Sequence, residues 1–393
     1  MSKRQKSFLG LDVLTKAILE QQAKISSLTE VKNSCLICVK QFQDDITELK
    51  SCLLKFKTAM NSKAVLHAQI PLSNESQPTL KLLRNYIVQF SITSQIPMND
   101  VLCSVKYSKN GAYFAFSTYL KLFLYDANKN ECIQAVSLPF DTSKAYEKAT
   151  RDVVFSPDSK YLVVCAADFS IFAFNVPMLT HAATIQKSSE AAAAIAFFND
   201  GKRLITTNKN GVINLWSLPQ FELIKSVKFA KNQNIVSVLI TNGDSSVIVL
   251  ASNSDICFYD SNLAQEPQIV SAESTFVYSG ALSRSSTYLC IAAQDPNAKL
   301  FNLVGKFRLE KNLVGHTDYI IGVEFSPDGK LVFTASKDET IRVWDVETGE
   351  MLATLTCHHN TVFAVSHHPT RNQIISCSGD GSICITSYTI VNK

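Results

Sequence analysis

The stretch that decides the fold is IIGVEFSPDGKLVFTASKDETIRVWDVETG, residues 320–349. An apolar strand runs into an FSPDG turn, a second strand runs into a KDET turn, and a third strand ends at Trp344-Asp345. Proline presets φ, aspartate bonds the local backbone and glycine tolerates a positive φ, so both polar clusters are typical of hairpin turns. The stretch therefore predicts three antiparallel strands joined by short turns.

The same pattern recurs along the chain when Phe325 is taken as an anchor. The equivalent anchors are Tyr107, Phe155, Phe197, Ile240, Leu282, Phe325 and His367. Their spacings are 48, 42, 43, 42, 43 and 42 residues. A period of about 40–45 residues is typical of four-stranded propeller blades. The sequence therefore predicts an all-β, seven-bladed β-propeller.

Closure of the ring depends on a segment that precedes the first repeat. The last repeat ends near Thr389 without an outer strand, and residues 86–92 alternate as a strand does. A propeller needs closure because open edge strands stay exposed. We therefore expect residues 86–92 to supply the outer strand of the last blade, within a propeller domain of residues 86–393.

Residues 8–60 carry a second pattern. Apolar residues follow a 3-4-3-4 spacing at Leu11, Leu14, Ile18, Ile25, Leu28, Cys35, Val39, Phe42, Ile46, Leu49, Leu53 and Phe56, with Gln21 and Lys32 as the polar members. This period of 3.5 predicts an N-terminal α-helical coiled coil for oligomerisation or partner binding. A lone amphipathic helix folded on the propeller is the alternative. Residues 61–85, with Pro71 and Pro78, are expected to be a linker.

The composition and the motifs do not indicate an enzyme active site. The net charge of +4 is mild, and no Walker-type loop, GxSxG or HExxH motif occurs. We expect no signal peptide, no membrane span, no cofactor and no metal, with reduced cysteines. Cys35-Leu36-Ile37-Cys38 lies inside the heptads, and we interpret the histidines near residues 358 and 367 as structural. Propeller enzymes need polar catalytic clusters at the central channel, and the sequence shows none, so we expect a non-enzymatic scaffold.

The repeats resemble WD repeats. His316, Ser336, Asp338 and Trp344 match the positions of that family's structural hydrogen-bond network, whose task is to satisfy buried polar groups. The last repeat keeps histidine, serine and aspartate but has Thr386 in place of tryptophan.

The resemblance also indicates a partner-binding face, at the loops that enter the innermost strands. The residues expected there are Arg151, Phe276, Tyr278, Tyr319, Ile321, Lys337, Thr361 and Phe363. Clustered aromatic side chains on a surface favour protein binding. The alternative for each of them is a core position between blades.

The combination of coiled coil, linker and seven blades is similar to the Tup/Groucho class of transcriptional corepressors. The first Tup repeat is similar to residues 101–126, VLCSVKYSKNGAYFAFSTYLKLFLYD, and the second is similar to residues 151–176, RDVVFSPDSKYLVVCAADFSIFAFNV. Fungal members of the class also have an extra segment after the first blade. The resemblance implies a nuclear, homo-oligomeric (tetrameric) corepressor. Its partners would be a tetratricopeptide-repeat corepressor, DNA-binding transcription factors, and histones or histone deacetylases, without direct reading of DNA bases.

Two other functions fit the same pattern. A heterotrimeric G-protein β subunit also has a coiled-coil helix before seven blades, and it pairs with a small γ chain. A WD-repeat assembly factor is the third possibility. The long N-terminal segment, the linker with its prolines and the 48-residue first step favour the corepressor.

Overall fold

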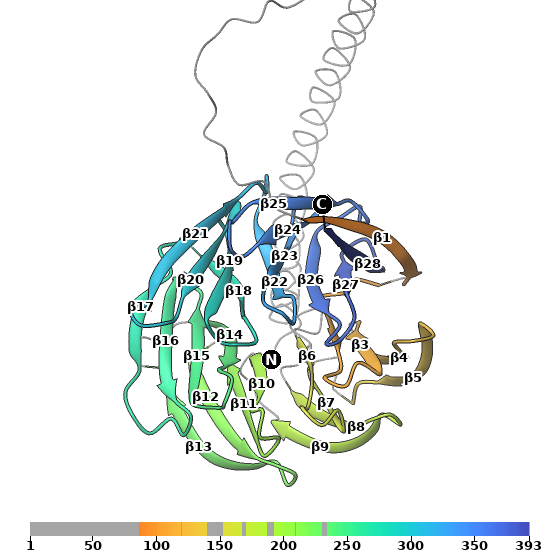
Figure 1. Cartoon of the computed structure of the whole chain (residues 1–393). Coiled ribbons are helices and arrows are strands. Elements are labelled where there is room, and N and C mark those ends of the chain that lie inside the picture. Colours follow the sequence, from red (N-terminus) through yellow and green to blue (C-terminus); the bar gives the residue numbers. More distant parts are fainter. Residues whose placement is uncertain are drawn as a thin grey trace, which may run out of the picture. The chain divides into compact units, whose positions relative to one another are not determined.

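The computed structural model describes residues 86–98, 100–118, 120–139, 152–166, 170–186, 192–208, 210–229, 234–274 and 276–392. The expected coiled coil (8–60) and linker (61–85) lie outside these residues, and so does Arg151. Residues 82–393 form one compact unit, which holds every strand given below. Within the described residues, all regular elements of this unit are strands (Figure 1).

Seven four-stranded antiparallel sheets make up the blades. Blades 1 to 3 are β2 (Ser104–Tyr107), β3 (Tyr113–Ser117), β4 (Lys121–Asp126), β5 (Glu131–Ser137); β6 (Asp152–Phe155), β7 (Tyr161–Cys165), β8 (Ile171–Asn175), β9 (Thr180–Gln186); β10 (Ala192–Phe197), β11 (Arg203–Asn208), β12 (Val212–Ser217), β13 (Glu222–Lys228). Blades 4 and 5 are β14 (Ile235–Ile240), β15 (Ser246–Ala251), β16 (Asp255–Asp260), β17 (Gln268–Ser271); β18 (Val277–Leu282), β19 (Tyr288–Ala293), β20 (Asn297–Asn302), β21 (Arg308–Val314). Blades 6 and 7 are β22 (Ile320–Phe325), β23 (Leu331–Ser336), β24 (Ile341–Asp345), β25 (Met351–Leu355); β26 (Val362–His367), β27 (Gln373–Ser378), β28 (Ser382–Asn392), β1 (Tyr86–Pro97).

Each of the seven anchor residues is the last residue of an innermost strand. The innermost strands contact their neighbours in the order β2, β6, β10, β14, β18, β22, β26, and β26 contacts β2. The blades therefore form a closed ring around a central channel, and the repeat period of the sequence is the period of the blades.

The core of the ring lies between the blades. Seven apolar clusters fill the seven interfaces, one for each pair of neighbouring blades. Middle strands such as β23 are buried along their whole length, because a blade lies against each of their faces, whereas outer strands such as β25 are partly exposed. Burial of apolar area at these interfaces is the main force that holds the blades together.

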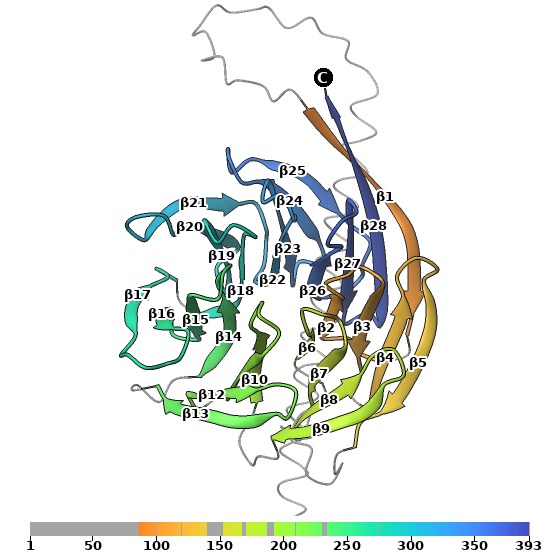
Figure 2. The same ribbon diagram turned by 60° about the horizontal axis from the view of Figure 1, so that its bottom comes forward.

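The last blade takes its outer strand from the beginning of the propeller. β1 pairs antiparallel with β28, from Tyr86 opposite Asn392 to Pro97 opposite Ser382. Figures 1 and 2 show β1 (orange) running beside β28 (dark blue), although the two strands are far apart in sequence. The strand is five residues longer than the expected segment 86–92, and a bulge lies between Ile92 and Ser94.

Candidate protein-interaction site

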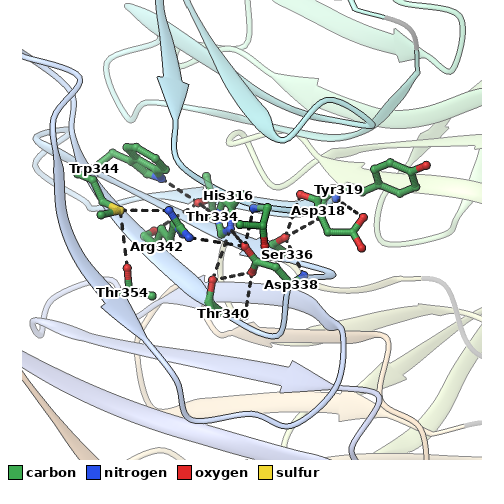
Figure 3. A network of polar contacts seen from close by, with 12 residues as sticks. His316, Asp318, Tyr319, Thr334, Ser336, Asp338, Thr340, Arg342, Trp344 and Thr354 are labelled. Carbon is green, nitrogen blue, oxygen red and sulfur yellow. Dashed lines mark hydrogen bonds and ion pairs between the residues drawn. The ribbon is translucent and has the colours of Figure 1, made fainter. Parts of the chain in front are cut away.

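A buried polar network fixes the loop that leads into blade 6 (Figure 3). The His316 Nδ1 lies 2.7 Å from the Asp338 carboxylate, and its Nε2 lies 2.7 Å from the Thr334 hydroxyl. The Trp344 indole N–H donates to the same hydroxyl at 2.8 Å. The Ser336 hydroxyl donates to the Tyr319 carbonyl at 2.9 Å. Thus the structure brings the four sequence-predicted network residues together and adds Thr334.

One arrangement of protons satisfies this network. Thr334 accepts from Trp344 and donates to His316 Nε2, while His316 Nδ1–H donates to Asp338, so the imidazole is neutral. Burial lowers the pKa of His316, and the Asp338 carboxylate only partly offsets it. Burial alone would raise the pKa of Asp338, but hydrogen bonds from Thr340, His316 and Thr317 lower it to about 2. His316 is therefore neutral, and it donates a hydrogen bond to the ionised carboxylate of Asp338.

Blade 7 repeats the network with smaller side chains. His358 Nδ1 lies 3.2 Å from the Asp380 carboxylate, and its Nε2 lies 2.8 Å from the Ser376 hydroxyl. Thr386 takes the place that tryptophan has in blade 6. Both histidines lie in the loop between the outer strand of the preceding blade and the next innermost strand, so the networks hold the entrance to that innermost strand in place.

The entrances to blades 5 and 6 carry three partly exposed aromatic side chains. We call Phe276, Tyr278 and Tyr319 the aromatic row: the first two rings lie 5.1 Å apart and the second two 6.2 Å apart, the latter stacked. All three are partly exposed. The Lys337 ammonium lies 5.0 Å from the centroid of the Tyr319 ring. Figure 3 shows the Tyr319 ring directed away from the buried network, while its backbone is bound to it.

Polar neighbours hold this surface in one conformation. Lys337 forms an ion pair with Asp318 at 3.3 Å while half of its side chain stays exposed. The Gln294 amide donates to the Tyr319 hydroxyl at 3.3 Å. Asp318 and Gln294 were missed by sequence reasoning, although Gln294 stands in blade 5 at the position that Lys337 has in blade 6. Tyr319 and Lys337 thus each have a polar contact within the chain beside the ring faces of the row.

Phe363 and Ile321 do not join the row through any ring contact in the described part of the chain. Phe363 packs against the apolar cluster between blades 7 and 1, so it belongs in part to the core. Ile321 is partly buried on β22. In the described part of the chain, the ring contacts among the expected face residues therefore join blades 5 and 6.

The innermost strands carry a charged pair that sequence reasoning did not predict. The Lys106 ammonium on β2 of blade 1 lies 3.4 Å from the Glu324 carboxylate on β22 of blade 6, so the ion pair spans blade 7. Burial would lower the pKa of Lys106, but Glu324 and Asp152 together raise it. The lysine therefore stays protonated, and a protonated amine is not a nucleophile. This favours a structural role for the pair.

Within the described residues, no group of three or more histidine, cysteine or acidic side chains is arranged to hold a metal ion. His367 binds the Tyr388 hydroxyl at 2.7 Å, and His368 binds the Gly111 carbonyl at 3.0 Å, so both have structural contacts. The same part of the chain has no helix with the length and apolar character that a bilayer span requires.

Three segments of the chain, residues 140–175, 307–345 and 349–387, match the family model described as WD domain, G-beta repeat. The chain is 22% identical over 299 residues to a WD repeat-containing protein 26 homolog from Arabidopsis thaliana, covering 75% of this chain and 50% of that protein. It is 26% identical over 202 residues to Autophagy-related protein 16 from the same plant, covering 51% and 39%. It is 20% identical over 329 residues to Apoptotic protease-activating factor 1 from Danio rerio, covering 81% and 25%.

The chain therefore contains segments similar to the WD domain within a seven-bladed propeller. The chain spans between a quarter and a half of the length of the three relatives named above.

Proposed function

We propose that this chain is a non-enzymatic scaffold that binds a peptide segment of its partner on the aromatic row, and that it acts as a general transcriptional corepressor. The observation that carries the proposal is the row itself: three partly exposed rings on two adjacent blades, with Lys337 beside them. DNA-binding proteins would recruit the scaffold, which would link them to chromatin in the nucleus.

The physical basis is the energetics of protein interfaces. Aromatic side chains bury much area and lose little conformational freedom, so they dominate binding energy when they lie in an ordered patch. Contacts with Gln294 and Asp318 restrain Tyr319 and Lys337 before binding, which lowers the entropy lost on association. The mild net charge of +4 agrees with a protein partner rather than direct reading of DNA.

The corepressor part of the proposal rests on the resemblance of the first two repeats to Tup repeats and on the heptads of residues 8–60. The three relatives named above are not described as corepressors, so this part needs its own test. The partners proposed are a tetratricopeptide-repeat protein, transcription factors, and histones or histone deacetylases. A G-protein β-like scaffold would instead bind one small helical chain.

Removal of the row tests the binding surface. In the variant Tyr278→Ala/Tyr319→Ala we expect partner affinity to fall by at least about 30-fold, corresponding to about 2 kcal/mol for hot-spot residues. The matched control is Leu223→Ala/Ile224→Ala on β13, where two exposed apolar side chains lie on an outer strand. Equal partner recovery by both folded variants would contradict the proposed surface.

Truncation tests the corepressor assignment. The intact chain and a chain without residues 1–60 are purified from cells, their mass is measured by light scattering, and bound proteins are identified by mass spectrometry. We expect a tetramer with a tetratricopeptide-repeat protein, histones or deacetylases, which are lost or reduced on truncation. A one-to-one complex with a small helical protein, or a monomer with cytoplasmic factors, would reject the assignment and leave only the scaffold.

A further inference from the structure

An arginine on blade 6 has few hydrogen-bond acceptors around it. The side chain of Arg342, on β24, is 14% exposed, and its Nη2 lies 3.9 Å from the Asp338 carboxylate, which is too far for a hydrogen bond. Its Nε–H is buried and has no hydrogen-bond partner in the described part of the chain. Buried donors that lack an acceptor cost free energy, so the charge of Arg342 is incompletely compensated.

The side-chain atom that accepts a hydrogen bond from Arg342 is the sulfur of a methionine. Met351 begins β25, the outer strand of the blade, and its Sδ accepts from Arg342 Nη1 at 3.4 Å (Figure 3). The Thr354 hydroxyl, on the same strand, donates to this sulfur at 3.7 Å. A thioether sulfur is only a weak acceptor. Two donors therefore converge on an atom that satisfies neither of them well.

Met351 is open to solvent, whereas the guanidinium behind it is not. Met351 is 47% exposed on the outer strand. On the inner side lies Gly315, where an added Cβ would be 3.6 Å from the Met351 sulfur and 2.6 Å from Arg342 Nη1. A side chain at residue 315 would therefore displace the guanidinium, and the glycine allows Arg342 to lie beside the sulfur. A small oxidant can approach from the solvent side.

We propose that Met351 is an oxidation site, whose sulfoxide is bound by the Arg342 guanidinium and the Thr354 hydroxyl. The Met351 sulfur attacks one oxygen of hydrogen peroxide, an S–O bond forms and the O–O bond breaks. The proton on the transferred oxygen passes to the released hydroxide, which leaves as water. The thioether loses two electrons and one peroxide is reduced. The new oxygen is a strong acceptor at the place where the two donors already converge.

The contact distances suit the product. The sulfoxide oxygen is one covalent bond from the sulfur, so it can reach hydrogen-bond distance of Arg342 Nη1 while the sulfur stays 3.4 Å from that nitrogen. Oxidation of methionine usually disrupts packing because the product is polar. Here a hydrogen bond to a charged group offsets that loss, by roughly 10-fold or more in the folding equilibrium. The inference depends neither on the aromatic row nor on the corepressor assignment.

Peroxide treatment of the full-length folded protein tests the site. Peptide mass spectrometry should find Met351 heavier by about 16 Da, as it should the more exposed Met178. Denaturant midpoints are then measured before and after oxidation, and Met351→Leu gives the contribution of all other oxidised residues. We expect Met351 oxidation to leave the midpoint of the wild-type protein unchanged or higher, and to lower that of Arg342→Leu. Asp338 keeps its hydrogen bonds from Thr317 and Thr340 in that variant.

Glutamine at residue 351 tests the binding of the oxygen without an oxidant, because its amide carries an acceptor oxygen near the end of the side chain. Met351→Gln should exceed Met351→Leu roughly 10-fold in the folding equilibrium constant, and this gain should disappear in the Arg342→Leu background. Two results would overturn the site. One is a folded wild-type protein in which peroxide oxidises Met178 and leaves Met351 unchanged. The other is an equal loss of stability on Met351 oxidation with and without Arg342.

Discussion

The hydroxyl of Thr334 is the most sensitive point of the blade 6 network. It is fully buried and contacts both the Trp344 indole nitrogen, at 2.8 Å, and His316 Nε2, at 2.7 Å. The substitution Thr334→Val keeps the shape of the side chain and removes the hydroxyl, so both Trp344 and His316 lose a hydrogen-bond partner. Each buried polar group left unpaired costs about 1–3 kcal/mol, so the free energy of unfolding should fall by about 2–6 kcal/mol.

Blade 3 offers a matched control for this substitution. Thr206 on β11 is equally buried and accepts a hydrogen bond from the Trp216 indole at 2.9 Å. The sequence has Ser188 where blade 6 has its histidine, so Thr206→Val removes the hydroxyl that the tryptophan binds but leaves no histidine unpaired. We expect it to cost less than Thr334→Val, because no buried imidazole loses a hydrogen-bond partner. Chemical denaturation of both variants measures the difference. A Thr334→Val variant no less stable than Thr206→Val would refute the reasoning.

Two further predictions concern pH and ring closure. The pKa values of His316, His358, His367 and His368 are all lowered, with burial the largest cause, so the unfolded chain binds more protons below about pH 6.5 and stability should fall from pH 7 to pH 5. Asp338, with a pKa of about 2, adds stability that is present above about pH 4 and lost as the pH falls toward 2. Stability that rises on acidification from pH 7 to 5, measured by denaturant titration, would contradict the neutral histidines. Gly111 has a φ of +71°, and a Cβ on it would lie 2.6 Å from His368, so Gly111→Ala should destabilise the junction of blades 1 and 7 by about 1–3 kcal/mol. Gly201→Ala, with a φ of +67° and no atom within 4 Å, carries the backbone strain alone, and an equal loss of stability in the two variants would show that the contact with His368 does not matter.

Most of the fold could be predicted from the repeat pattern. All seven anchors end innermost strands because the apolar period and the turn residues are set by the same four-stranded unit in every blade. The length of β1 was underestimated for a local reason. The bulge between Ile92 and Ser94 breaks the alternation of side chains, so a pattern of period two ends there although the strand continues to Pro97.

Contacts between distant residues were harder to predict. Lys106 and Glu324 are 218 positions apart and meet only because the ring closes around the channel. Thr334 joins the network from the middle of β23, where a threonine is an ordinary strand residue and carries no local signal. Phe363 has an aromatic side chain at an expected surface position, yet it packs in part against the cluster between blades 7 and 1. The sequence pattern gives the position on the strand but not the neighbours across the interface.

Partner binding on the aromatic row can be tested at the residue beside it. A photo-crosslinking phenylalanine analogue placed at Lys337, and in a second protein at Leu223 on the outer strand of blade 3, tests it in the cells that express the chain. We expect a DNA-binding protein or a histone to be crosslinked from position 337 and not from position 223, and Tyr319→Ala in the same protein to remove this product. Crosslinks to such partners from position 223 alone, or an undiminished product with Tyr319→Ala, would contradict it.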